Sequence, residues 1–123
     1  MKGAYFVAAG LLVVLGAAHS YLGERYILMR LFRLELPKLF GGTAFTKATL
    51  RFAWHLTTVG WIGFAALMCL AASPELDTGR SRDLAMAATF AVSGIVSLIG
   101  SKGRHLSWIV FFLVSALMLI AAL

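Results

Sequence analysis

The chain has 123 residues, of which 61% are hydrophobic and only 13% are charged, and its mean hydropathy is +0.91. A soluble domain carries roughly 25% charged residues, so the composition excludes an ordinary water-soluble fold and predicts an integral membrane protein. The net charge of +6 could suggest nucleic acid, but membrane topology explains it better, because basic side chains suit anionic headgroups. We therefore expect a lipid bilayer, and no nucleic acid, as partner.

Four apolar runs cover most of the chain, at residues 4–22, 52–72, 84–100 and 106–123. A helix needs about 20 apolar residues to cross a hydrocarbon core about 30 Å thick. Helices are the expected form because their backbone satisfies its own hydrogen bonds in lipid. The sequence therefore predicts an all-α fold, a four-helix transmembrane bundle in which residues 1–123 form a single integral membrane domain.

The first connection, residues 23–51, is long and contains a further amphipathic segment. Between residues 25 and 36, apolar side chains recur at helical spacing, at Ile27, Leu28, Leu31 and Leu34. This spacing indicates either a continuation of the first helix or an interfacial amphipathic helix lying among the headgroups. Pro37 should end it, because proline cannot continue helical hydrogen bonding. We expect an interfacial amphipathic segment after the first span.

Basic residues are divided unevenly between the two ends of the predicted bundle. The end that carries both termini has three of them, Lys2, Arg80 and Arg82. The opposite end has the remaining eight, Arg25, Arg30, Arg33, Lys38, Lys47, Arg51, Lys102 and Arg104. The positive-inside rule places the basic loops in the cytoplasm. The sequence thus predicts a multi-pass protein with its N- and C-termini outside.

The three histidines provide the strongest hint of chemistry. His19, His55 and His105 fall near the same end of three different apolar runs, and antiparallel threading brings them to similar depth. Ionisable side chains at such depth are costly and usually mark a functional site. Glu24 is the expected acidic member of this site. Its expected charged surroundings are Arg51 and Arg104.

One interpretation of this site is a metal centre. Three imidazoles and a carboxylate suit zinc, copper or iron, so the predicted ligands are His19, His55, His105 and Glu24. Haem is a less favoured alternative, because histidines near the interface would bury its macrocycle poorly, although Arg51 or Arg104 could pair with a propionate. No HExxH motif, Ser-His-Asp set, phosphate loop or nucleotide fingerprint is present. Whether the protein is an enzyme is left open.

The competing interpretation is structural. The histidines would hydrogen-bond across helices and Glu24 would pair with Arg51, Arg25 or Arg104, forming a polar rim that joins the helices. The chain would then be a noncatalytic membrane subunit or scaffold, either in a homo-oligomer or docked to a larger membrane complex. The many small residues of the third run would let neighbouring helices approach closely. Recognition of anionic lipid headgroups by the basic end is a third hypothesis. Cys69 is expected to be a small buried hydrophobe.

Three segments carry a resemblance to a family. They read His-Ser-Tyr-Leu-Gly-Glu-Arg at 19–25, Ala-Trp-His at 53–55 and Gly-Arg-His-Leu-Ser-Trp at 103–108. Together they resemble segments of a group of small, uncharacterised bacterial four-span inner-membrane proteins, over most of the chain. The resemblance implies a four-span architecture and the bacterial cytoplasmic membrane, and it brings no established activity. Leu106-Ser107 departs from it, since a proline would be expected nearby.

Overall fold

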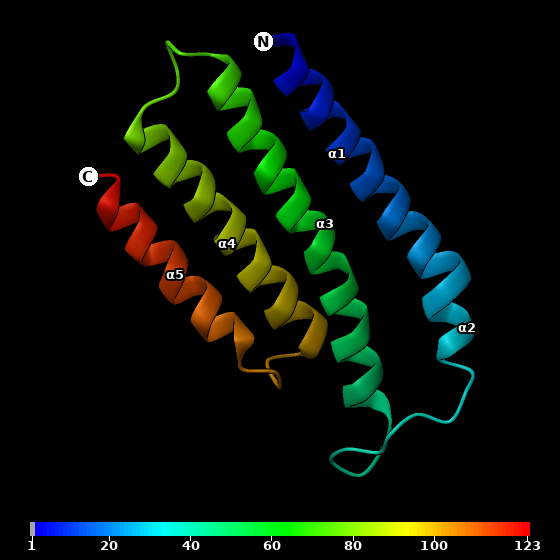
Figure 1. Cartoon of the computed structure of the whole chain (residues 1–123). Coiled ribbons are helices and arrows are strands. Elements are labelled where there is room, and N and C mark those ends of the chain that lie inside the picture. The colour runs from blue at the N-terminus through cyan, green and yellow to red at the C-terminus, as the bar shows by residue number, and fades with distance from the viewer. Residues whose placement is uncertain (1) are drawn as a thin grey trace.

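Helices make up the regular structure of this protein. The computed structural model describes residues 2–123, in which α1 (Lys2–Leu22) continues through a π-helical turn, η1 (Gly23–Leu28), into α2 (Met29–Leu31). The other helices are α3 (Ala44–Ala72), α4 (Gly79–Ser101) and α5 (Ser107–Ala121) (Figure 1). The predicted all-α fold is confirmed.

The helices stand in a row that follows their order in the chain. α1 packs on α3, α3 packs on α4, and α4 packs on α5, whereas within residues 2–123 α1 does not contact α4 and α3 does not contact α5. Figure 1 shows this row, with both termini at one end of the molecule. As a result, the outermost helices, α1 and α5, each have a single packing neighbour.

Three helical segments are long and apolar enough to cross a membrane. They are Lys2–Leu31 with 30 residues, Ala44–Ala72 with 29 residues and Gly79–Ser101 with 23 residues. The fourth apolar helix, Ser107–Ala121, is shorter, with 15 residues. These helices give the chain the character of an integral membrane protein. The three longer segments extend past the predicted apolar runs, because polar residues at their ends continue the helical backbone hydrogen bonding, whereas α5 is shorter than the predicted run at 106–123.

The amphipathic segment after the first run continues the first helix, which is one of the two alternatives predicted for it. No proline occurs in η1 or α2, so the helical backbone continues from Gly23 to Leu31. Leu28, on this continuation, is buried at 2% exposure. The helix ends at Leu31, before Pro37 is reached. The connection is then tied to α3, because the hydroxyl of Thr46 donates to the carbonyl of Pro37 at 2.8 Å.

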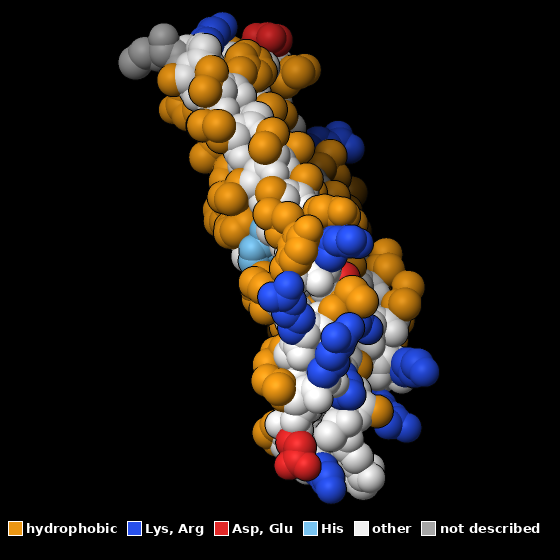
Figure 2. Space-filling view, turned by 90° about the vertical axis from the view of Figure 1, so that its right-hand side faces the viewer, with side chains coloured by type: hydrophobic (Ala, Val, Ile, Leu, Met, Phe, Trp, Pro, Cys, Tyr) orange, Lys and Arg blue, Asp and Glu red, His pale blue; other side chains and the backbone are white. Residues whose placement is uncertain are grey.

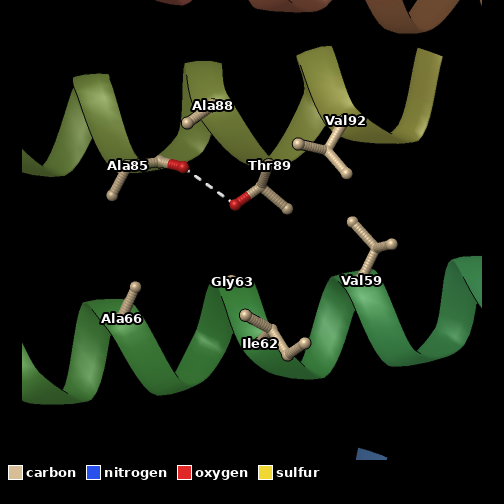
Figure 3. Close-up of a pocket in the computed structure, with 8 residues that line it drawn as sticks. All are labelled: Val59, Ile62, Gly63, Ala66, Ala85, Ala88, Thr89 and Val92. Atoms are coloured by element: carbon tan, nitrogen blue, oxygen red, sulfur yellow. Dashed lines mark hydrogen bonds between the residues drawn. The ribbon is translucent and has the colours of Figure 1, made fainter. Parts of the chain in front are cut away.

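A glycine of the second run sets the contact between α3 and α4. A Cβ atom added to Gly63 would lie 2.6 Å from the side chain of Thr89, so no larger residue fits there. Figure 3 shows this approach, with the Thr89 hydroxyl donating to the carbonyl of Ala85 at 2.8 Å. The expectation that Cys69 is buried is wrong. Its thiol is exposed, because in this open row the residue lies on the outside of α3.

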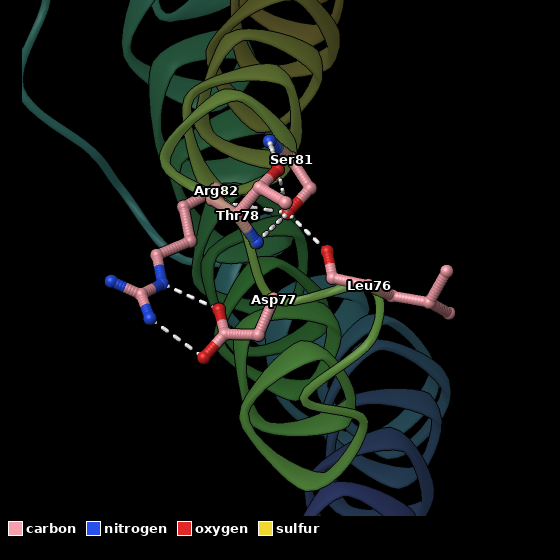
Figure 4. A network of polar contacts seen from close by, with 5 residues as sticks. All are labelled: Leu76, Asp77, Thr78, Ser81 and Arg82. Carbon is pink, nitrogen blue, oxygen red and sulfur yellow. Dashed lines mark hydrogen bonds and ion pairs between the residues drawn. The ribbon is translucent and has the colours of Figure 1, made fainter.

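A polar network closes the turn between α3 and α4 (Figure 4). Thr78 and Ser81 form a capping box, in which the Ser81 amide donates to the Thr78 hydroxyl at 3.0 Å and the Thr78 amide donates to the Ser81 hydroxyl at 2.9 Å. Asp77 accepts two hydrogen bonds from the guanidinium of Arg82. These hydrogen bonds, with the positive charge beside them, hold the pKa of Asp77 below its ordinary value of 3.8.

This lowered pKa predicts an acid-sensitive contribution to stability. A carboxyl group whose pKa is lower in the folded state stabilises the fold above its unfolded pKa, and the contribution disappears as pH falls through the folded value. Asp77→Asn should therefore lower the melting temperature slightly at neutral pH, and the difference from the wild type should shrink below pH 3.8. Thermal scans of both proteins across the acid range check this, and a difference that stays constant with pH would contradict it.

Candidate functional site

A polar cluster lies where α1 and its π-helical turn pack on α3, and it consists of Ser20, Glu24, Arg51, His55 and Thr58. The hydroxyl of Ser20 lies 2.9 Å from Nδ1 of His55 and 2.7 Å from the hydroxyl oxygen of Thr58. Thr58 in turn donates to the carbonyl of Gly16 at 3.1 Å. His55 and Thr58 of α3 thus form hydrogen bonds with successive turns of α1, between helices whose other contacts are mostly apolar.

The charged part of the cluster lies one helical turn further along. Arg51 binds both carboxylate oxygens of Glu24 with two nitrogens of its guanidinium. Its Nη2 lies 2.9 Å from Oε1, and its Nε donates to Oε2 at 3.1 Å. Nε2 of His55 lies 3.5 Å from the same carboxylate. The side chains of Glu24 and His55 are each one third exposed and that of Arg51 is half exposed. The structure thus contains the Glu24–Arg51 pair of the structural interpretation.

His19 makes its contacts with two tryptophans of α3. Its ring stacks on Trp54 at 4.5 Å between centroids, with 5° between the planes, and meets the edge of Trp61 at 5.0 Å. Nε2 of His19 lies 3.3 Å from the backbone oxygen of Trp54, whose indole nitrogen donates to the His19 carbonyl at 3.0 Å. These reciprocal bonds make His19 and Trp54 a second joint between α1 and α3.

His105 lies on the other side of α3, in the turn between α4 and α5. Its ring contacts Phe52 at 5.2 Å and Phe45 at 6.1 Å between centroids. Nδ1 lies 2.9 Å from the hydroxyl of Ser107, and the His105 amide donates to the hydroxyl of Ser101 at 3.2 Å. All three histidines are therefore at the same end of α3, as predicted, but they face different neighbours.

The predicted ligand set is consequently divided. His55 and Glu24 meet, while His19 bonds to Trp54 and His105 bonds to Ser107. Within residues 2–123, no group of three or more His, Cys, Asp or Glu side chains is arranged to hold a metal ion. Of the two predicted supporting residues, Arg51 joins the cluster, whereas Arg104 lines a separate cavity beside Phe40.

Sequence reasoning missed Ser20 and Thr58 as members of the site. Their spacing carried a signal, since Ser20 lies four residues before Glu24 and Thr58 three residues after His55, so each pair shares a helix face. In the structure, the Ser20 hydroxyl, the His55 imidazole and the Glu24 carboxylate follow one another in a line, although no sequence motif indicates such a set. This order of groups raises the question of a nucleophilic serine.

Counting hydrogens answers this question. The contacts that join His55 to Ser20, Ser20 to Thr58, and Thr58 to Gly16 require three hydrogens, and the two hydroxyl groups supply only two. When all three contacts are hydrogen bonds at once, Nδ1 of His55 supplies the third hydrogen and the Ser20 hydroxyl donates to Thr58. Ser20 also lies in the interior of α1, where the backbone amides that could stabilise an oxyanion are already bonded within the helix. The geometry is that of a joint between helices.

Comparisons of the chain with protein-family models, with curated proteins and with solved structures give no match.

Proposed function

We propose that this chain is a noncatalytic membrane subunit or scaffold in which the polar cluster joins α1 to α3. The observation that carries the proposal is that the hydroxyl, imidazole and carboxylate groups of the cluster bond to the opposite helix. Unpaired polar groups are costly in an apolar surrounding, so these side chains favour one pairing of the helices. A metal centre is the less supported alternative. A catalytic zinc takes three protein ligands and a structural zinc takes four, whereas the cluster brings together two of the predicted ligands, His55 and Glu24.

The distribution of charge supports an orientation for the scaffold. Figure 2 shows the side of the molecule formed by α1, where lysines and arginines gather over the end that carries η1, α2 and the connection to α3. Positive charge near membrane spans favours the cytoplasmic side. We therefore propose a multi-pass protein of the bacterial cytoplasmic membrane with both termini outside. Its α5 would be the fourth span, and local thinning of the bilayer would compensate for the short length of this helix.

The open row offers a docking face on α1. Leu11 and Val14 are 66% and 67% exposed, on the side of the helix away from α3. The proposed partner is an apolar transmembrane helix of a larger membrane complex, which would pack along this face as α3 packs along the other. Van der Waals packing of this kind is the main attraction between helices in lipid.

Photo-crosslinking in native membranes tests the scaffold proposal. A photoreactive residue at Leu11 should yield one discrete protein adduct, whereas the same residue at Ala87, which is 2% exposed between α4 and α5, should yield none. Both positions lie in apolar helices, so the pair compares a position that is open to the membrane with one that is covered by a neighbouring helix. An adduct of two copies would replace the larger complex by a homo-oligomer. Adducts with lipid alone at Leu11 would contradict the proposal.

A further inference from the structure

A groove of about 320 Å³ opens between α3 and α4 at the basic end of the molecule. It runs from the helix ends towards the level of His55, and its lining includes Ala48 and Arg51 of α3 and Ile95 and Ile99 of α4. Gly100 sits against Phe52 so closely that an added Cβ would lie 2.6 Å from the Cβ of Phe52. This close approach of the helices forms the floor of the groove.

The walls of the groove differ in chemistry along its length. On the α4 side, Ile95 and Ile99 are 47% and 71% exposed and present an apolar wall. At the outer end, Arg51 of α3 binds Glu24 through Nε and Nη2, and its guanidinium lies over the ring of Phe32 at 4.9 Å. Within residues 2–123 its Nη1 makes no hydrogen bond. Lys47 lies one helical turn before Arg51, and Lys102 directly follows the last residue of α4. The lining of the groove is apolar apart from His55 and Arg51, and Lys47 and Lys102 add positive charge at the neighbouring helix ends.

We propose that this groove binds an anionic phospholipid of the surrounding membrane. One acyl chain would lie along Ile95 and Ile99, and the phosphate would sit among Lys47, Arg51 and Lys102. Basic pockets between transmembrane helices on the cytoplasmic side are the kind of site that holds acidic lipid headgroups. Long basic side chains reach the headgroup level while their stems lie on apolar surface.

The two other grooves between α3 and α4 lack this combination. The groove in Figure 3 is lined by aliphatic side chains and Thr89, and a third, on the side that includes Phe111 of α5, has no lysine or arginine in its lining. The occupant is therefore assigned from charge complementarity. The proposal concerns a lipid and does not depend on whether the chain is a scaffold, so each can fail without the other.

Native mass spectrometry of the full chain in neutral detergent provides the test, with phosphatidylglycerol and phosphatidylcholine of identical acyl chains as probes. Phosphatidylglycerol should bind at least tenfold more tightly. Each basic residue near a headgroup contributes about a fivefold change in affinity, so Lys47→Gln and Lys102→Gln should each weaken binding by about that factor. Arg30→Gln is the matched control, since Arg30 lies at the same end but in α2, which does not contact α4.

Filling the groove tests the acyl chain separately from the charge. Ala48→Leu should abolish phosphatidylglycerol binding, while Ala88→Leu, the same change in the groove of Figure 3, should leave it intact. If Ala48→Leu does not fold, Ile99→Trp covers the groove from an exposed position. Equal affinity for both lipids, an equal loss in Arg30→Gln, binding that survives in a folded groove-filling variant, or equally tight binding of glycerol phosphate without acyl chains would overturn the proposal.

Discussion

Replacing Gly23 with alanine is expected to lower the free energy of unfolding by about 3 kcal/mol, the upper part of the range for overpacking a tight contact. A Cβ atom at this position would lie 2.0 Å from the indole nitrogen of Trp54 and 2.3 Å from the adjacent ring carbon. The indole has little room to move, because it stacks on His19 and donates to the His19 carbonyl. The added methyl group therefore has to separate α1 from α3.

Gly10→Ala is the matched control for this prediction. Gly10 lies in the same helix, and a Cβ atom added there meets nothing within 4 Å. Alanine has the higher helix propensity, so this variant should be neutral or more stable by up to about 1 kcal/mol. Unfolding in mixed micelles, followed as the SDS fraction rises, measures both variants. Similar free energies for the two would mean that α1 does not pack on Trp54 as described.

His55→Ala is expected to lower the free energy of unfolding by about 2 kcal/mol, because it removes a partly buried hydrogen-bonding side chain and leaves its partners incompletely bonded. The variant loses the bond to Ser20 and the contact with Glu24 together. Individual hydrogen bonds between membrane helices contribute about 0.6 kcal/mol on average and up to about 1.7, so two contacts and the lost packing account for this value.

Thr57→Ala provides the comparison for His55→Ala in the same micelle titration. Thr57 is the second residue after His55 on α3, and its side chain is exposed. Exposed substitutions away from such contacts usually change stability by less than about 0.5 kcal/mol. A His55→Ala variant as stable as Thr57→Ala would show that the imidazole does not join the helices.

The sequence predicted the helices and the level of the histidines because both depend on hydropathy along the chain. Long apolar runs define the spans, and antiparallel threading fixes which ends meet. The face that each side chain turns to a neighbour depends instead on the order of helices in space. His105 contacts Phe52 on one side of α3, while His55 contacts Ser20 on the other. A row and a closed ring of helices have the same hydropathy profile, so this difference was not predictable.

The position of Glu24 shows a second limit of sequence reasoning. Ser20 and Glu24 are four residues apart and so share a helix face, and in the structure both reach His55. The structure places Glu24 within a π-helical turn, where wider backbone bonding changes the direction of the side chains that follow. Such turns have no simple sequence signature. Trp54 fills the space that Gly23 leaves open, a contact between α3 and the π-helical turn that no sequence motif indicates.

The most direct test of the polar cluster as a joint between α1 and α3 is a double-mutant cycle. The unfolding free energies of the wild type, Ser20→Ala, His55→Ala and the double variant are measured with a chelator and again with added zinc. We expect a coupling free energy of about 0.6 to 1.7 kcal/mol between Ser20 and His55, the same in both conditions. Additive losses, or a coupling that is present only with zinc, would contradict this account.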